Sequence, residues 1–447
     1  MIAAVNSSAN LNGLVKTVSS TSVMVILVCY FVQGALGMSR LAISFLFKDS
    51  FHLSPSEVDA YRGIAALPWI IKPLYGFLTD TVPLLGYRKK SYLIVAGLIG
   101  CSAWCVFSRA SIVSTAVIAE IFASASVAFS DVVVDSIVVE SSRDGSDLQT
   151  LCWGSRAVGD VLSAYFSGSL LEYVSPRNVL LMTSLLPLCI TLSAFTLDEA
   201  PIEASQLSWN DLYKKLLAQG EQLRLTIINP KIYYPVLFIF CWQATPSCNS
   251  AMLYFKTNEL HFKPEFLGRV RLVSSLAHLF GVLIYRNFLK QIKLKSLIFW
   301  TSLVSVPLSL SEVLLTTHLN RSMGIPDEVF ALSDTAVVAV LGQIASMPTL
   351  ILAASLCPPG VEGTLFAALM SIYNLAGTLS HELGAFLTWV LGVTQDNYAN
   401  LSILVVLCSL SNLLPLPFID IIDPVAEKVA VTSEDTEKPS SATLKSL

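Results

Sequence analysis

The chain alternates between long runs of apolar residues and short polar turns over most of its length. Runs long enough to cross a lipid bilayer, which takes roughly 20 residues as a helix, recur between positions 21 and 418. The uninterrupted runs cover residues 91–107, 180–197, 297–317, 335–356 and 401–418. When runs broken by a polar residue or a proline are added, the pattern predicts about twelve helical membrane spans.

The composition agrees with this pattern. Of 447 residues, 54% are hydrophobic and 13% are charged, and the mean hydropathy is +0.66, which lies outside the range of ordinary soluble domains. We therefore predict an all-α, multi-pass membrane protein surrounded by lipid. The nine cysteines fall almost entirely within apolar runs, where a free thiol packs as a small hydrophobe.

The usual signatures of catalysis and of metal binding are missing from the sequence. It contains no CxxC pair, no Cys/His zinc spacing, no nucleophile elbow and no phosphate-binding loop. We therefore expect neither an enzyme nor an ATP-driven pump, and no metal, cofactor or nucleic-acid partner. A multi-pass protein of this kind either moves a solute or belongs to a different class, a membrane receptor or a multi-span enzyme. Counterflow of labelled solute would distinguish a transporter from a receptor.

A polar stretch divides the predicted spans into two groups of six. The predicted parts are a cytosolic tail (1–22), a first six-span bundle (23–197), a cytosolic linker (198–230), a second six-span bundle (231–420) and a disordered cytosolic tail (421–447). Within the linker, apolar residues between positions 209 and 217 have the spacing of an amphipathic helix. Such a helix either lies on the membrane surface or packs on the bundle, and both readings stay open.

Basic residues gather in turns on one side of the predicted bundle. The turn after the second span carries Arg88, Lys89 and Lys90. The equivalent turn after the eighth carries Lys290, Lys293 and Lys295. Because Lys and Arg are enriched in cytosolic loops, we expect both termini in the cytosol. Two six-span halves in parallel repeat are the architecture of the major facilitator fold, whose substrate site lies near the midplane between the halves.

The fourth predicted span carries the densest intramembrane charge. Asp131 and Asp135 lie one helical turn apart, and Glu120 projects within roughly 60° of both. Ionised side chains are costly in hydrocarbon, so this face should line the transport path. Crowding of like charges helps one carboxylate to retain a proton, which would suit a proton carrier. Alternatively, the three carboxylates pair with basic residues and hold the bundle together.

Basic residues in other spans are candidates to balance these carboxylates or to bind an anion. Lys72 is the foremost candidate, because apolar residues and a proline surround it deep in the second span. Arg40 in the first span and Arg271 in the eighth are further candidates. Arg156 in the fifth span has Asp160 one turn further on, so these two residues could also satisfy each other.

The second half has fewer charges. In the seventh span Trp242 precedes Pro246, which predicts a helix break of the kind found where backbone groups line a cavity. His381 and Glu382 in the eleventh span form either a protonation site near neutral pH or a local contact between helices.

Several longer segments carry a resemblance to a known family. They are Gln33-Gly-Ala-Leu-Gly-Met-Ser-Arg40, Leu67-Pro-Trp-Ile-Ile-Lys-Pro-Leu-Tyr-Gly-Phe77, Asp131-Val-Val-Val-Asp-Ser-Ile-Val-Val-Glu140, Trp153-Gly-Ser-Arg-Ala-Val-Gly159 and Phe266-Leu-Gly-Arg-Val-Arg-Leu272. On these segments the chain resembles the folate–biopterin transporter family, a branch of the major facilitator superfamily found in plants, cyanobacteria and protozoa. Its plant members look most similar, and the resemblance runs from residue 33 to residue 418.

The resemblance implies a secondary active transporter, a symporter that moves folate or related pterins by alternating access, coupled to protons. A pterin ring presents an N–H and an amino group side by side, which Asp131 or Asp135 could accept as a pair. Trp242, Trp69 or Trp153 could stack on the ring, and the protons would be carried by Asp131, Asp135 or Glu120. The anionic tail of folate requires basic side chains. The candidates for that contact are Lys72, Arg40, Arg156 and Arg271.

Two departures from the family pattern fall in the second half. Asn249 stands where an aspartate is common, and Ser380-His381-Glu382 replaces part of a glycine-rich segment. These positions bear on substrate choice, so a transporter of the same fold for another anionic or aromatic solute is the alternative. We expect a monomer, and the sequence leaves plastid, vacuole and plasma membrane equally open.

Overall fold

The computed structural model describes residues 20–141, 147–201, 213–214, 217–218, 220–221, 224, 228–289, 292–355 and 362–422. Within these ranges the chain is helical almost throughout, apart from an isolated β-bridge between Leu84 and Tyr87. Most of the predicted amphipathic linker helix, and residues 423–447 of the predicted C-terminal tail, lie outside the described residues.

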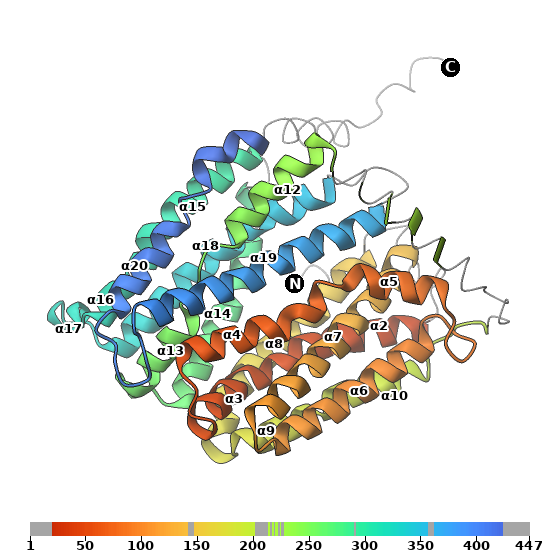
Figure 1. Cartoon of the computed structure of the whole chain (residues 1–447), viewed down its shortest axis with the longest axis horizontal. Helices are drawn as coiled ribbons and strands as arrows, with labels where there is room; N and C mark the ends of the chain where they lie inside the picture. The colour runs from red at the N-terminus through yellow and green to blue at the C-terminus, as the bar shows by residue number, and fades with distance from the viewer. Residues whose placement is uncertain are drawn as a thin grey trace, which may run out of the picture.

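The first half of the chain forms one bundle, drawn red to yellow in Figure 1. Its elements are α2 (Ser20–Ala35), η2 (Leu36–Met38), α3 (Ser39–Phe45), η3 (Leu46–Ser50), α4 (Pro55–Ala66), η4 (Leu67–Trp69), α5 (Lys72–Thr81), α6 (Lys90–Arg109), α7 (Val113–Ser141), α8 (Asp147–Tyr173), α9 (Pro176–Thr183) and α10 (Leu185–Ala194). The stretches α2–η3, α4–α5 and α9–α10 are each one interrupted passage through the bundle, and the helices α6, α7 and α8 are each one continuous passage.

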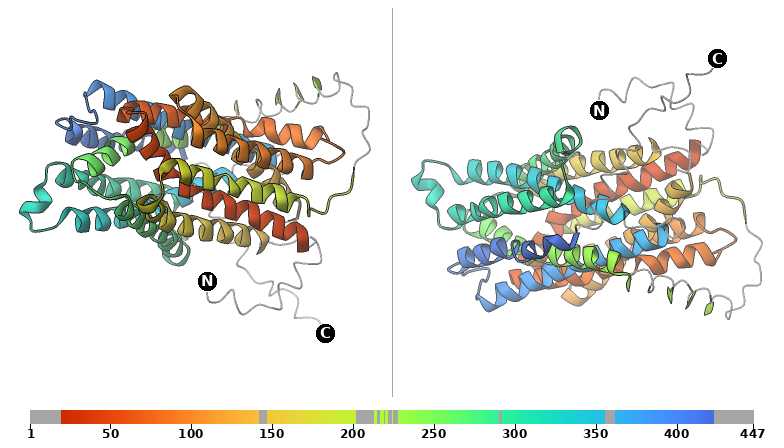
Figure 2. Two further views of the ribbon diagram at one scale, coloured as in Figure 1. Left: turned by 90° about the horizontal axis from the view of Figure 1, so that it is seen from below. Right: turned by 90° about the horizontal axis from the view of Figure 1, so that it is seen from above.

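The second half forms a second bundle, drawn green to blue, and both bundles run along the same long axis (Figure 2). Its elements are α12 (Pro230–Gln243), α13 (Asn249–Asn258), α14 (Pro264–Ile284), η6 (Tyr285–Leu289), α15 (Leu294–Leu310), α16 (Glu312–Thr316), α17 (Leu319–Ser322), α18 (Asp327–Ser355), α19 (Glu362–Val390), α20 (Leu401–Ser411) and η7 (Leu416–Ile422). The passages are α12–α13, α14–η6, α15–α16, α18, α19 and α20–η7.

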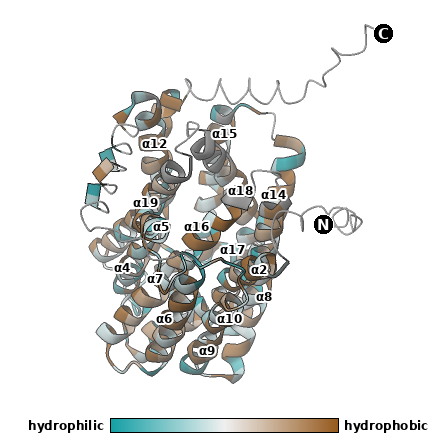
Figure 3. Ribbon diagram, turned by 90° about the vertical axis from the view of Figure 1, so that its right-hand side faces the viewer, coloured by the Kyte–Doolittle hydropathy of each residue, from teal (hydrophilic) through white to brown (hydrophobic). Residues whose placement is uncertain are grey.

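The arrangement confirms the predicted fold of two six-span bundles. Among the described residues, 8 helical stretches are long and apolar enough to cross a membrane. The other passages, α4–α5, α8, α12–α13 and α19, are interrupted or richer in polar residues, which is why hydropathy alone undercounts them. Hydrophobic residues predominate along the helices (Figure 3), and many large apolar side chains face outward, among them Trp300, Phe288 and Trp389, as expected for a surface in contact with lipid.

The second passage breaks at the point where Lys72 enters the bundle. Pro68 and Pro73 cannot donate a backbone hydrogen bond, so the helix gives way to the short turn η4 and restarts as α5 with Lys72 as its first residue. At the other end of the passage, Ser54 and Glu57 form a capping box that fixes the start of α4. Local sequence therefore sets both the break and the position of the lysine.

The predicted break near Pro246 is also present, between α12 and α13. Helix α19 supplies a hydrogen-bond donor to a backbone carbonyl in the break. Ser380 Oγ donates to the carbonyl of Thr245 at 2.6 Å, and a Cβ at Gly384 would come within 1.9 Å of the carbonyl oxygen of Ser247. The segment Ser380–Gly384 thus packs against the break and bonds to its backbone.

The two halves meet tightly at one end of the molecule, which we call the distal end. It contains the turns at 51–54, 110–112, 174–175, 259–263 and 391–400, and it lies opposite the described ends of the connection between the halves, 195–201 and 228–229. Side chains from both halves share an apolar cluster there, with Leu41 and Phe45 packed with Ala251, Met252 and Phe255. Helices α8 and α14 cross so closely that a Cβ on Gly168 would lie 2.6 Å from the Cα of Gly268.

Candidate functional site

A buried ion pair joins Lys72 of α5 to Asp131 of α7. The two side chains are 11% and 8% exposed. A charge taken out of water in this way is stable only with a partner, and removal of one partner leaves a costly unpaired charge. In this structure Lys72 is a charge partner of Asp131, which is one of the two roles predicted for it.

Asp135, one turn along α7, has a different partner. Tyr30 of α2 donates its hydroxyl to Asp135 Oδ1 at 2.5 Å. The Tyr30 ring lies 6.4 Å from the ring of Trp153 on α8, and the guanidinium of Arg156 lies 5.5 Å from that same ring. Carboxylate, phenol, indole and guanidinium therefore gather where α2, α7 and α8 meet.

Arg156 does not pair locally in the way the sequence allowed. Its Nη1 donates to Gln33 Oε1 on α2 at 3.3 Å, and it lies in electrostatic range of Asp135 and Arg40. Asp160 instead lies in range of Arg40 and of Arg271, which comes from the other half. The basic residues of both halves thus converge on one carboxylate.

Arg271 connects the halves directly. It lies on α14, and its Nη1 donates to the backbone carbonyl of Gly37 in η2 at 2.9 Å. A second link lies near Lys72, whose Nζ is 5.0 Å from the Trp69 ring. Asn374 of α19 donates to the carbonyl of Trp69 at 3.3 Å. The group formed by Lys72, Asp131, Asp135, Arg156, Arg40, Asp160 and Arg271, which we call the central charge cluster, therefore touches both halves.

Glu120 does not belong to this cluster. It shares a helix face with Asp131, but 11 residues separate them, which is roughly 16 Å along the axis of α7. It lies in electrostatic range of Arg62 on α4. Angular periodicity correctly groups the three carboxylates on one face, yet it says nothing of their depth in the bundle.

Trp242 and Asn249 lie on either side of the break in the seventh passage. The Trp242 indole donates to Ser302 Oγ at 3.1 Å and packs against an apolar cluster within the second half. Asn249 is the first residue of α13 and is exposed. The structure therefore gives Trp242 a packing role in its own half and does not bring it against the central charge cluster.

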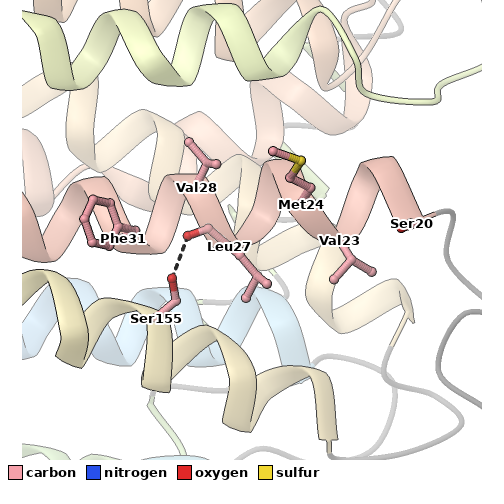
Figure 4. A pocket seen from close by; sticks show the side chains of 7 residues that line it. All are labelled: Ser20, Val23, Met24, Leu27, Val28, Phe31 and Ser155. Carbon is pink, nitrogen blue, oxygen red and sulfur yellow. Dashed lines mark hydrogen bonds between the residues drawn. The ribbon is translucent and has the colours of Figure 1, made fainter. Parts of the chain in front are cut away.

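An apolar groove lies between α2 and α8, away from these charges (Figure 4). Ser155 Oγ on α8 donates to the carbonyl of Leu27 at 2.8 Å across it. Its lining residues are Ser20, Val23, Met24, Leu27, Val28, Phe31 and Ser155. Because it offers no charged side chain, it does not suit an anionic solute.

Sequence reasoning did not single out Tyr30 as a functional residue. The signal was present, since Tyr30, Gln33, Gly37 and Arg40 recur at intervals of three or four residues and so share one face of the first span. Tyrosine is common in membrane helices, and its role becomes visible only when α2 is placed beside α7.

Comparison with known proteins gives the same family along nearly the whole chain. The model of the BT1 family matches residues 33–443. A folate-biopterin transporter of Synechocystis sp. is 46% identical over 427 residues, covering 94% of this chain and 85% of that protein. A probable folate-biopterin transporter 4 of Arabidopsis thaliana is 29% identical, with 91% and 96% covered.

A solved structure shows the same fold. The crystal structure of the nucleoside transporter NupG aligns with a TM-score of 0.68 over 89% of this chain and 98% of that chain, at 13% sequence identity. At this identity the match concerns the fold alone.

Proposed function

Because the chain belongs to the BT1 family, we propose that it moves folate or a related pterin across a membrane by alternating access, with protons as the coupling ion. The observation that supports this most directly is the central charge cluster, which joins buried carboxylates of one half to basic groups of both halves. Buried charges in a membrane bundle mark solute and ion pathways more often than they serve packing alone.

We assign the carboxylates to the pterin ring and the proton. Asp131 is already paired with Lys72, whereas Asp135 holds one phenolic hydrogen bond from Tyr30. Asp135 is therefore the freer of the two to accept the paired N–H groups of a pterin. Protonation of Asp131 would weaken its pairing with Lys72, and protonation of Asp135 would weaken its bonds to the substrate, which links proton binding to substrate binding.

We assign the basic residues to the anionic tail. Arg40 and Arg271 both lie in electrostatic range of Asp160, so the positive charges near Asp160 outnumber its single negative charge. A planar guanidinium binds a carboxylate through two hydrogen bonds. Because Arg271 belongs to the second half, an anion held between it and Arg40 would draw the halves together.

The experiment is uptake of labelled folic acid and of labelled biopterin into cells that lack their own folate carrier, with and without a proton gradient. We expect accumulation that collapses when the gradient is removed. If protein shown to reach the membrane took up neither solute, the proposal would fail, and other anionic aromatic solutes would be tested next.

A matched pair of variants on α14 tests the tail assignment. Arg271→Ala should lower folate uptake by at least tenfold and leave biopterin uptake, which involves no tail carboxylate, within a factor of about two. Arg269→Ala is the control, because Arg269 is exposed and pairs with Glu265 on its own helix. Equal loss of both solutes in Arg271→Ala would indicate a structural role through Gly37 instead.

A further inference from the structure

A second buried carboxyl group lies outside the central charge cluster, at the interface between the halves. Asp59 of α4 is 0% exposed. Its Oδ1 accepts a hydrogen bond of 2.5 Å from the hydroxyl of Ser250, on α13 of the other half. Its Oδ2 is buried and meets no hydrogen-bond partner among the described residues. This carboxyl group thus bridges the two halves with one oxygen and leaves the other unsatisfied.

No cation compensates Asp59 by direct contact within the described part of the chain. Arg62, one turn along α4, lies in electrostatic range, but its guanidinium donates to Ser44 Oγ on α3. Tyr254 of α13 donates its hydroxyl to the carbonyl of Leu53 at 2.7 Å, not to Asp59. The titratable and charged groups facing this region, element by element, are Lys48 and Asp49 of η3, Arg62 of α4, Glu120 of α7, Cys248 and Tyr254 at α13, and His381 and Glu382 of α19.

Two of these neighbours are also incompletely bonded. Glu120 Oε2 and His381 Nδ1 are buried without a hydrogen-bond partner among the described residues. Glu382 packs against Gly63, where a Cβ would come within 2.2 Å of its Oε1. The interface is therefore polar here, and the apolar cluster shared between the halves includes Ala251, the residue after Ser250.

The physical cost of this arrangement depends on protonation. A buried carboxylate with one unsatisfied oxygen and no contacting cation is strongly disfavoured in its charged form, while the neutral acid is tolerated. When the halves separate at the distal end, water reaches Asp59 and the charged form becomes favourable again. Closure and proton binding must then reinforce each other, because coupling between two equilibria is reciprocal.

From this geometry we propose that Asp59 binds a proton whenever the halves close at the distal end, and releases it to water on that side when they open. The role of this proton in transport rests on the proposed function. There, Asp59 would be a proton site on the pathway separate from Asp131 and Asp135. The coupling of closure to protonation concerns the empty protein and needs no substrate.

The test is amide hydrogen exchange of the substrate-free protein in lipid nanodiscs, measured on peptides covering 55–63 and 249–258 between pH 4.5 and 8. After correction for the intrinsic pH dependence of exchange, a single linked proton changes the open-to-closed ratio by up to tenfold per pH unit. Protonation favours the closed form, so corrected exchange should rise as pH rises. In Asp59→Asn, which mimics the neutral acid, corrected exchange should stay slow and independent of pH.

Asp49→Asn is the control, since Asp49 is an exposed carboxylate nearby that pairs with Lys48, and it should behave as the wild type. If Asp59→Asn fails to fold, Ser250→Ala takes its place. Removal of that hydroxyl destabilises the charged form in the closed state, so exchange should keep rising to a higher pH than in the wild type. Corrected exchange that is flat in the wild type, or equally pH-dependent in Asp59→Asn, would overturn the inference. A positive exchange result without folate uptake would reject the proposed substrate alone.

Discussion

Removal of one partner of the Lys72–Asp131 pair should destabilise the protein far more than removal of both. The side chains are about nine-tenths buried, so Lys72→Met leaves a carboxylate, and Asp131→Asn an ammonium, in a poorly solvated site. Two unit charges at contact distance attract by about 4 kcal/mol at an effective dielectric constant near 20. Loss of one member of a buried pair typically costs about 3–5 kcal/mol, and we expect this cost for each single variant.

The double variant Lys72→Met/Asp131→Asn carries no unpaired charge, so its free energy of unfolding should return to within about 1–2 kcal/mol of the wild type. The assay is unfolding in mixed micelles of a mild detergent and sodium dodecyl sulfate, for the four proteins of a double-mutant cycle. The pair Arg269–Glu265, with side chains 67% and 34% exposed, is the control, and Arg269→Met should cost roughly 1 kcal/mol or less. If the free energy of unfolding fell in the double variant by the sum of the losses in the two single variants, the residues would be acting independently. The reasoning would then be refuted.

Two further predictions concern single contacts. Tyr30→Phe removes the hydroxyl that binds Asp135 at 2.5 Å. The Asp135 carboxyl should then hold its proton to higher pH, so the pH optimum of uptake should move upward. An unchanged pH profile would contradict the assignment. Gly384→Ala should sharply lower the yield of folded protein on size-exclusion chromatography, because the new Cβ would meet the Ser247 carbonyl at 1.9 Å. Gly377→Ala, on the same helix with its nearest contact at 3.9 Å, should leave the yield unchanged, and equal behaviour of the two would show that the break can adjust.

The fold could be predicted from the sequence because the features that determine it are local. Apolar runs, prolines and basic turns gave the spans, the break near Pro246 and the division into halves. The foremost charged residues, Lys72 and Asp131, were also recognisable, since charge in an apolar run needs a partner whatever the fold.

Partnerships across the bundle could not be predicted in the same way. Asp59 lies within two residues of the helix start signal Ser54–Glu57, so in the sequence it resembles a solvated residue near a span end. Its partner Ser250 is 191 residues away, and no periodicity connects them. Periodicity did group Glu120 with the other carboxylates of α7. It gives the direction of a side chain around the helix axis but not its depth in the bundle, so the grouping did not hold for depth.

The close crossing of Gly168 and Gly268 has a mechanical consequence. Backbone in contact with backbone leaves little room to slide, so this crossing is the natural fulcrum for any rocking of the halves. On α8, Gly168 lies 5 residues from one end and 21 from the other, which are lever arms of roughly 8 and 32 Å. A given rotation therefore sweeps the far mouth about four times as widely as the near one. A bulky solute would therefore enter or leave most easily at the end far from the crossing. At the distal end, near the crossing, the halves need to separate by only a few ångströms to let water in.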